Sequence, residues 1–149
     1  QSYDHTTLPS STSFMDTAKV IYLGGLRNEA THLRSGQVIV TDAPPDNKGR
    51  GEAFSPTDLL STSLACCMMT LMGIAAQEKD IPLTGLNARV VKHMASGPRR
   101  VAKIEVHLEL DGSALSEKQR SILEHTARTC PVALSLREDL EQEVTFTYR

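Results

Sequence analysis

The sequence contains no tryptophan, and tyrosine and phenylalanine together make up only 4% of its 149 residues. Few aromatic rings are therefore available on which a nucleobase, a sugar or a flavin could stack. Neither sign of charge dominates, because 18 acidic residues nearly balance 16 lysines and arginines and give a formal net charge of -2. We therefore expect no nucleic-acid or membrane partner.

Cysteine and histidine are scarce as well. The three cysteines are an odd number and form no CxxC pair, and no secretory signal peptide is evident. This pattern predicts a protein of the reducing cytoplasm rather than a disulfide scaffold. The five histidines show no HxxxH or HExxH spacing, so we expect no metal site.

The chain length fits one domain with a substantial core. Residues 1–14 are rich in Ser, Thr, Pro and His and have no apolar period, which predicts a flexible N-terminal tail. We expect a single domain over residues 15–149.

A long apolar stretch, residues 55–77, predicts a central helix. Ser55 is a suitable N-cap, Pro56 fits the first helical position, and Asp58 can complete a capping box. Because apolar residues occupy nearly every side, we expect a buried helix. Its length would also suit a membrane span, but its Ser, Thr and Asp content and the absence of a second span argue against one.

The remaining pattern predicts strands with a second helix. Residues 18–26 suit a strand that bends at Gly24 and Gly25. A turn at Ser35 and Gly36 follows, and then a strand over 37–41. We expect these two strands to form a first hairpin. Further strands are expected over 85–94, 100–111 and 143–148, and a helix over 116–130 with Ser116 and Gln119 as its capping box. The order predicts an α+β fold with mainly antiparallel sheets packed around the buried helix.

Three side chains are candidates for chemistry: Cys67 on the central helix, Cys130 before Pro131, and Arg27 after the early strand. A thiol is nucleophilic only as a thiolate, and burial raises its pKa unless a cation lowers it. The helix N-terminus is about three turns from Cys67, too far to supply that charge. Arg27 is the preferred cation because a guanidinium keeps its charge when partly buried.

On residue chemistry alone, the three cysteines are better explained as core side chains than as reactive thiols, because free cysteine is among the most buried residue types. Arg27 would then be a surface or ion-pairing residue. Cys66 is given this structural role, since its position turns it ~100° away from Cys67 on the helix. Arg34 and Arg50 are weaker candidates for the cation.

Three segments nevertheless resemble one known family. They are YLGGLRNEATH, GEAFSPTDLLSTSLACCMMTLMGIAA and TCPVALSL, which together with their spacing resemble the OsmC/Ohr family of osmotically induced and organic hydroperoxide resistance proteins. The resemblance extends over about residues 19–149. Within the family, the chain resembles the OsmC-like branch more closely than the dedicated hydroperoxide enzymes. It implies an α+β fold built as an interlocked homodimer.

The resemblance also implies a thiol-dependent peroxidase that reduces organic hydroperoxides. Cys67 corresponds to the peroxidatic cysteine, Cys130 to the resolving cysteine and Arg27 to the active-site arginine. The implied cycle passes through a Cys67 sulfenic acid and a Cys67–Cys130 disulfide, needs an external dithiol reductant and uses no metal, haem or flavin.

One position departs from the family pattern. Many members have a glutamate directly after the motif proline, where it holds the arginine, whereas this chain has Thr57. Asp58 and Glu52 are the candidates to replace it.

Apolar residues near the thiol favour a hydrophobic peroxide as substrate: Leu60, Leu64, Leu71 and Phe54. Two other functions remain open. One is a non-catalytic OsmC-like protein that binds a small apolar ligand, and the other is a stress-associated dimer whose cysteines are only core residues.

Overall fold

The computed structural model of the chain describes residues 16–149, so the tail expected over 1–14 lies outside the described residues. By its internal contacts the chain divides into two compact units, Gln1–Ser55 and Pro56–Arg149. Each unit is described by itself, and the single domain expected over 15–149 stays a prediction.

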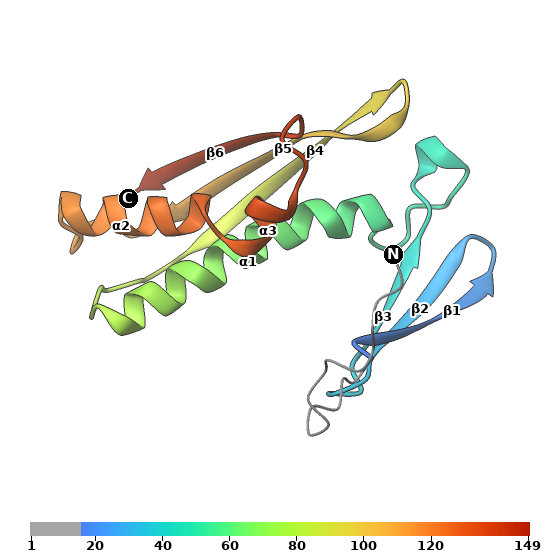
Figure 1. Cartoon of the computed structure of the whole chain (residues 1–149), viewed down its shortest axis with the longest axis horizontal. Coiled ribbons are helices and arrows are strands. Elements are labelled where there is room, and N and C mark those ends of the chain that lie inside the picture. The colour runs from blue at the N-terminus through green and yellow to red at the C-terminus, as the bar shows by residue number, and fades with distance from the viewer. Residues whose placement is uncertain (1–15) are drawn as a thin grey trace, which may run out of the picture. The chain divides into compact units, whose positions relative to one another are not determined.

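The first unit contains a three-stranded antiparallel sheet, here called the N-terminal sheet. Its strands are β1 (Ala18–Gly24), β2 (Arg27–His32) and β3 (Val38–Asp42), in the order β1-β2-β3 (Figure 1). A loop with the short 3-10 helix η2 (Pro45–Asn47) follows β3. The expected turn at Ser35 and Gly36 is confirmed: the N–H of Gly36 donates to the carbonyl of His32 at 2.7 Å.

The expected single strand over 18–26 is wrong, because the chain reverses there. Gly24 pairs with Arg27, which leaves Gly25 and Leu26 as a two-residue hairpin loop. Both loop residues have positive φ angles, 62° and 64°, as a type I′ turn requires. Leucine rarely adopts this conformation; its N–H donates to the hydroxyl of Tyr22 at 3.2 Å.

The second unit is organised around α1 (Pro56–Glu78), whose first residue is the proline expected at that position. The predicted bounds are therefore confirmed to within one residue. Burial is confined to one face within this chain, however, formed by Ser61, Leu64, Ala65, Met68, Met72, Ala75 and Ala76. Leu60 and Ile74 stay 40% and 43% exposed, so the helix is not buried on all sides of a single chain.

Three strands and two further helices complete this unit. They are β4 (Asn87–Ser96), β5 (Arg99–Leu110), α2 (Glu117–Arg128), α3 (Pro131–Ser135) and β6 (Glu141–Tyr148). The three helices cover one face of the sheet β4-β5-β6, here called the C-terminal sheet (Figure 1). β4 and β5 are antiparallel, whereas β6 runs parallel to β5 because the chain crosses over through α2 and α3.

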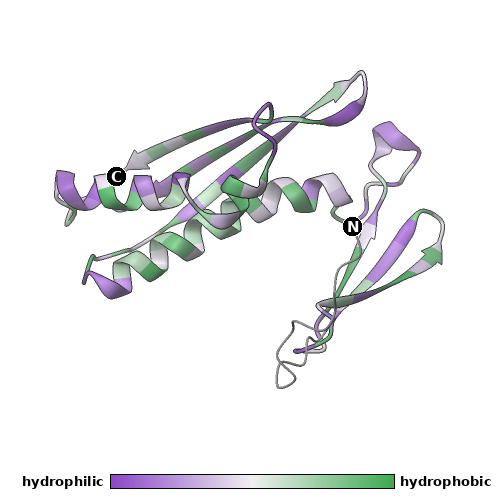
Figure 2. Cartoon of the chain, viewed as in Figure 1, coloured by the Kyte–Doolittle hydropathy of each residue, from purple (hydrophilic) through white to green (hydrophobic). Residues whose placement is uncertain are grey.

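The C-terminal sheet has one apolar face and one polar face. Hydropathy alternates along its strands (Figure 2). In β5, Ile104, Val106 and Leu108 are buried among the core residues, while Glu105 and His107 alternate with them and lie on the other face. The alternation expected for this strand is confirmed.

Candidate active site

Two neighbouring cysteines lie near the middle of α1 in different environments. Cys66 is exposed, whereas Cys67 is partly buried and packs against the core of the second unit. Consecutive residues on a helix are turned by ~100°, which explains why one thiol faces solvent and the other faces the core. Only Cys67 is therefore placed to react with a group from the core side.

Cys130 lies at the junction of α2 and α3 and is fully buried. It is the N-cap of α3, and Pro131 begins that helix. The proline ends the preceding segment and fixes the reversal of the chain. Since α1 packs on both α2 and α3, this junction lies against α1.

The structure brings the two sulfurs together. The side chain of Cys67 lies near enough to that of Cys130 to interact with it, although 62 residues separate them in the sequence. Burial raises the pKa of the Cys130 thiol, and the contact with Cys67 raises it further, while the backbone amides of Ala133 and Val132 act in the opposite direction. At neutral pH Cys130 thus keeps its proton.

Arg27, the first residue of β2, pairs with one of the two acids named from the sequence. Its Nη1 atom lies 3.4 Å from Oε2 of Glu52. Asp42 supports this pair: it is opposite Arg27 in the β2–β3 ladder, and its Oδ2 accepts the backbone N–H of Glu52 at 3.1 Å. Asp42 is 1% exposed, and its other oxygen, Oδ1, has no hydrogen-bond partner within the described chain.

Thr57 and Asp58 lie in the second unit and contact a lysine of β4. The Nζ atom of Lys92 is 2.8 Å from Oδ1 of Asp58 and donates to Oγ1 of Thr57 at 3.0 Å. Arg27 and Glu52 belong to the first unit. That Arg27 acts on the Cys67 sulfur therefore stays a prediction, as does a role for Asp58 or Thr57 in orienting it.

The four residues expected to line an apolar pocket differ in exposure. Leu64 is fully buried in the core and Leu71 is partly buried against it, while Leu60 on α1 is 40% exposed. Phe54 lies in the first unit and is 54% exposed. Their role in binding a substrate stays a prediction.

Comparison with known proteins agrees with this fold. The family model described as "OsmC-like protein" matches residues 49–145, about two thirds of the chain. The chain belongs to the OsmC family. The matched segment contains α1, both sulfurs of the contact and the whole C-terminal sheet except its last residues.

Solved structures of OsmC-type proteins are similar over most of this chain. A protein of Psychrobacter arcticus, provisionally described as an osmotic stress induced and detoxification response protein, is 48% identical with a TM-score of 0.84, covering 91% of this chain and 98% of that one. An organic hydroperoxide resistance protein OsmC of Legionella pneumophila is 16% identical with a TM-score of 0.71, covering 91% and 99%. At that identity the likeness shows the fold alone. A search among curated proteins finds no significant match.

Within this OsmC-family chain, sequence reasoning missed Asp42 and Lys92. Asp42 is an acid at the end of a strand and before a loop, a place where acids are common for solubility and turn formation. Only its burial and its hydrogen bond to Glu52 distinguish it. In the sequence, Lys92 is one polar residue of an alternating strand and has no distinguishing neighbour. Its contacts with Asp58 and Thr57 depend on the packing of α1 on β4.

Proposed function

We propose that this protein is a cysteine-based peroxidase that reduces organic hydroperoxides to alcohols. The observation that carries the proposal is the contact between the Cys67 and Cys130 side chains, one partly buried and one fully buried. Membership of the OsmC family, whose solved structures include organic hydroperoxide resistance proteins, supports a peroxide-related role in stress.

The chemistry begins at Cys67. Its thiolate attacks the distal oxygen of the hydroperoxide, the O–O bond breaks, and the alkoxide leaves as an alcohol after taking a proton. Cys67 is thereby oxidised to a sulfenic acid. Arg27, held by Glu52, stabilises the negative charge that develops on the peroxide oxygens.

Cys130 then resolves the intermediate. Its sulfur attacks the sulfenic acid, water leaves, and a Cys67–Cys130 disulfide forms. An external dithiol reopens this bond by exchange and is itself oxidised to a disulfide. The cycle uses no metal, haem or flavin, and its need for a reductant is the reason we assign the protein to the cytoplasm.

Apolar residues on α1 suit a hydrophobic peroxide better than hydrogen peroxide. Leu60 and Cys67 are seven residues apart and so lie on the same side of the helix, and Leu60 is exposed. We propose that this side, with Leu71 and Phe54, contacts the organic group of the substrate, while Leu64 supports it from the core.

The test compares three chains under one assay: wild type, Cys67→Ser and Cys66→Ser. Consumption of cumene hydroperoxide with a dithiol donor is expected in wild type and in Cys66→Ser, and is expected to be lost in Cys67→Ser. Mass spectrometry after one equivalent of peroxide should find the new link between residues 67 and 130. An inactive wild type with three unmodified thiols would favour the ligand-binding or stress-associated dimer instead.

A further inference from the structure

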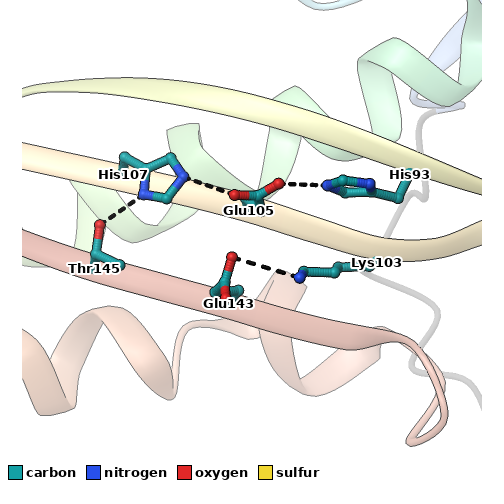
Figure 3. Close-up of polar contacts among 6 residues, drawn as sticks. All are labelled: His93, Lys103, Glu105, His107, Glu143 and Thr145. Atoms are coloured by element: carbon teal, nitrogen blue, oxygen red, sulfur yellow. Dashed lines mark hydrogen bonds and ion pairs between the residues drawn. The ribbon is translucent and has the colours of Figure 1, made fainter.

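A cluster of six polar side chains covers part of the polar face of the C-terminal sheet, opposite the face on which α1, α2 and α3 pack (Figure 1). We call it the outer-face cluster, and it consists of His93, Lys103, Glu105, His107, Glu143 and Thr145 (Figure 3). Strand register explains why these residues meet. His93 pairs with Lys103, Glu105 with Glu143, and His107 with Thr145 across neighbouring strands.

Glu105 is the centre of the cluster. Its Oε2 contacts Nε2 of His93, and its Oε1 lies 3.0 Å from Nε2 of His107 (Figure 3). The hydrogen bond from His93 and then that from His107 lower the pKa of Glu105 to about 2. Both carboxylate oxygens of Glu105 are therefore in contact with a histidine nitrogen.

A second carboxylate, Glu143, lies beside the first in the parallel β5–β6 ladder. Like charges at directly opposite positions are destabilising unless a cation lies between or beside them. Lys103 pairs with Glu143, but its Nζ is 3.6 Å from Oε2, which is a long ion pair. The negative charge of the cluster is only loosely compensated by this contact.

His107 is held in the orientation that a metal ligand needs. Its Nδ1 is 2.7 Å from Oγ1 of Thr145, while its Nε2 points at Glu105. The role of each nitrogen depends on the tautomer: with its proton on Nε2 the ring donates to Glu105, and with its proton on Nδ1 it donates to Thr145. In the second tautomer the lone pair of Nε2 faces Glu105, where both groups can bind one cation. Metal-bound histidines commonly have their second nitrogen fixed in this way.

We propose that Glu105, His107 and Glu143 bind a divalent transition-metal ion such as Zn²⁺. One ligand atom from each lies within 4.8 Å of the other two. The separation between Oε1 of Glu105 and Nε2 of His107 already approaches the ~3.3 Å that two ligands of one tetrahedral zinc ion adopt at bond lengths of ~2.0–2.1 Å. Imidazole with carboxylate is a ligand set that suits Zn²⁺ and its neighbours in the series.

The other members of the cluster have secondary roles. His93 holds Oε2 of Glu105, so that Oε1 faces His107 and the proposed ion, and Thr145 fixes His107. Lys103 competes with the metal for Glu143. Three protein ligands leave a fourth position for water or an exogenous ligand. The helices that carry Cys67 and Cys130 pack on the opposite face of the C-terminal sheet, so the proposed metal site is separate from the two thiols.

The test is a Zn²⁺ titration of the full chain, freed of metal by a chelator, followed by isothermal calorimetry. We expect one ion per chain in wild type. His107→Ala and Glu143→Gln should each weaken binding by at least about 10-fold, and Thr145→Val by about 10-fold. Lys103→Met should strengthen binding, a gain that a misfolded variant cannot produce. His125→Ala, at an exposed position of α2, is the matched control and should bind as wild type does.

Cysteine thiols could bind Zn²⁺ as well, so Co²⁺ serves as the second probe. Thiolate ligation gives an intense near-ultraviolet charge-transfer band that imidazole and carboxylate ligands do not give. We expect no such band, and the same affinities in a Cys67→Ser background. Binding that is unchanged in His107→Ala and Glu143→Gln, binding that disappears in Cys67→Ser, or no saturable binding at all would each overturn the proposal.

Discussion

Arg27 and Glu52 form an ion pair whose partners are 34% and 54% exposed. Exposed pairs of this kind contribute only about 0–1 kcal/mol to stability, so replacing either residue should leave the fold intact. Under the proposed function, Arg27→Met should lower kcat/KM for an organic hydroperoxide by on the order of 100-fold, because a positive group at the developing charge is lost. Steady-state peroxide consumption measures this.

Glu52→Gln keeps the arginine but removes its anchor, and we expect a smaller loss, on the order of 10-fold. The matched control is Asp58→Asn, whose carboxylate pairs with Lys92. If Asp58→Asn reduces turnover more than Glu52→Gln does, the assignment of Glu52 as the residue that orients Arg27 is wrong. Unchanged turnover in Arg27→Met would remove Arg27 from the mechanism.

Cys130 gives a second prediction at this scale, in the pH dependence of stability. Its pKa is raised in the folded chain, mainly by burial. Between the ordinary cysteine pKa of about 8.5 and this raised value, the unfolded chain has lost a proton that the folded chain keeps. The free energy of unfolding should therefore fall as pH rises through that range, and the contribution is fully present below it.

Urea unfolding of the reduced protein at about pH 7.5 and about pH 9.5 measures this change. Cys130→Ala should lose less stability between the two values than wild type does, whereas the exposed-thiol control Cys66→Ala should behave as wild type. Tyr148, whose pKa burial and Glu124 raise to about 12, acts in the same direction at higher pH and is present in all three chains. Identical pH dependence in wild type and Cys130→Ala would contradict the prediction.

At the scale of elements, α2 is fixed by a complete capping box. The N–H of Gln119 donates to Oγ of Ser116 at 3.1 Å, and the N–H of Ser116 donates to Oε1 of Gln119 at 3.0 Å. Ser116→Ala should lower the free energy of unfolding by about 1 kcal/mol, and Ser116→Gly by only a few tenths. Equal losses in the two variants, measured by urea unfolding, would show that the cap contributes little.

Local signals made α1 and α2 predictable from the sequence. Pro56 and the Ser116–Gln119 pair mark the helix starts by chemistry that depends only on near neighbours. The hairpin at Gly25 and Leu26 was missed because leucine is not a residue that usually marks a type I′ turn. The parallel pairing of β5 and β6 depends on how α2 and α3 cross the sheet, which no local pattern records.

The candidate sites, like the fold, were only partly predictable from the sequence. Cys67 and Cys130 were named from motifs, but their contact could not be derived from spacing, since it depends on α1 packing against the α2–α3 junction. The expectation of no metal site rested on helical histidine spacings. It did not consider Glu105 and His107, which share one face of a strand, or Glu143, which register brings beside them.

At the scale of the whole molecule, neither face of the N-terminal sheet is covered by another helix or sheet of the described part of the first unit. Register places Val20, Tyr22 and Ile39 on one face and Ile21, Val38 and Val40 on the other, and all six are more than a third exposed. Exposed apolar surface of this extent is typical of an interaction site. Leu60 and Ile74 on α1 are exposed as well. From these surfaces we propose that the functional unit is the homodimer that the family resemblance implies.

The register also says which face should meet the partner. Arg27 lies on the same face as Val40, because Val40 pairs with Glu29 and residues 27 and 29 point the same way. If Arg27 acts at a thiol site, its face must be turned towards that site, and Val40 must be covered in the dimer. Val40→Lys should then dissociate the dimer, because an unpaired ammonium buried in an apolar interface costs more free energy than the lost contact.

Ile39→Lys is the matched control, since Ile39 is the neighbouring residue on the opposite face and is 46% exposed. Sedimentation equilibrium should find wild type and Ile39→Lys at twice the mass of one chain and Val40→Lys at the mass of one. Peroxidase activity should be lost together with the dimer. A monomeric wild type, or dissociation by Ile39→Lys but not by Val40→Lys, would mean that the face carrying Arg27 does not form the interface. Contact between Arg27 and the sulfur of Cys67 could then not depend on that interface.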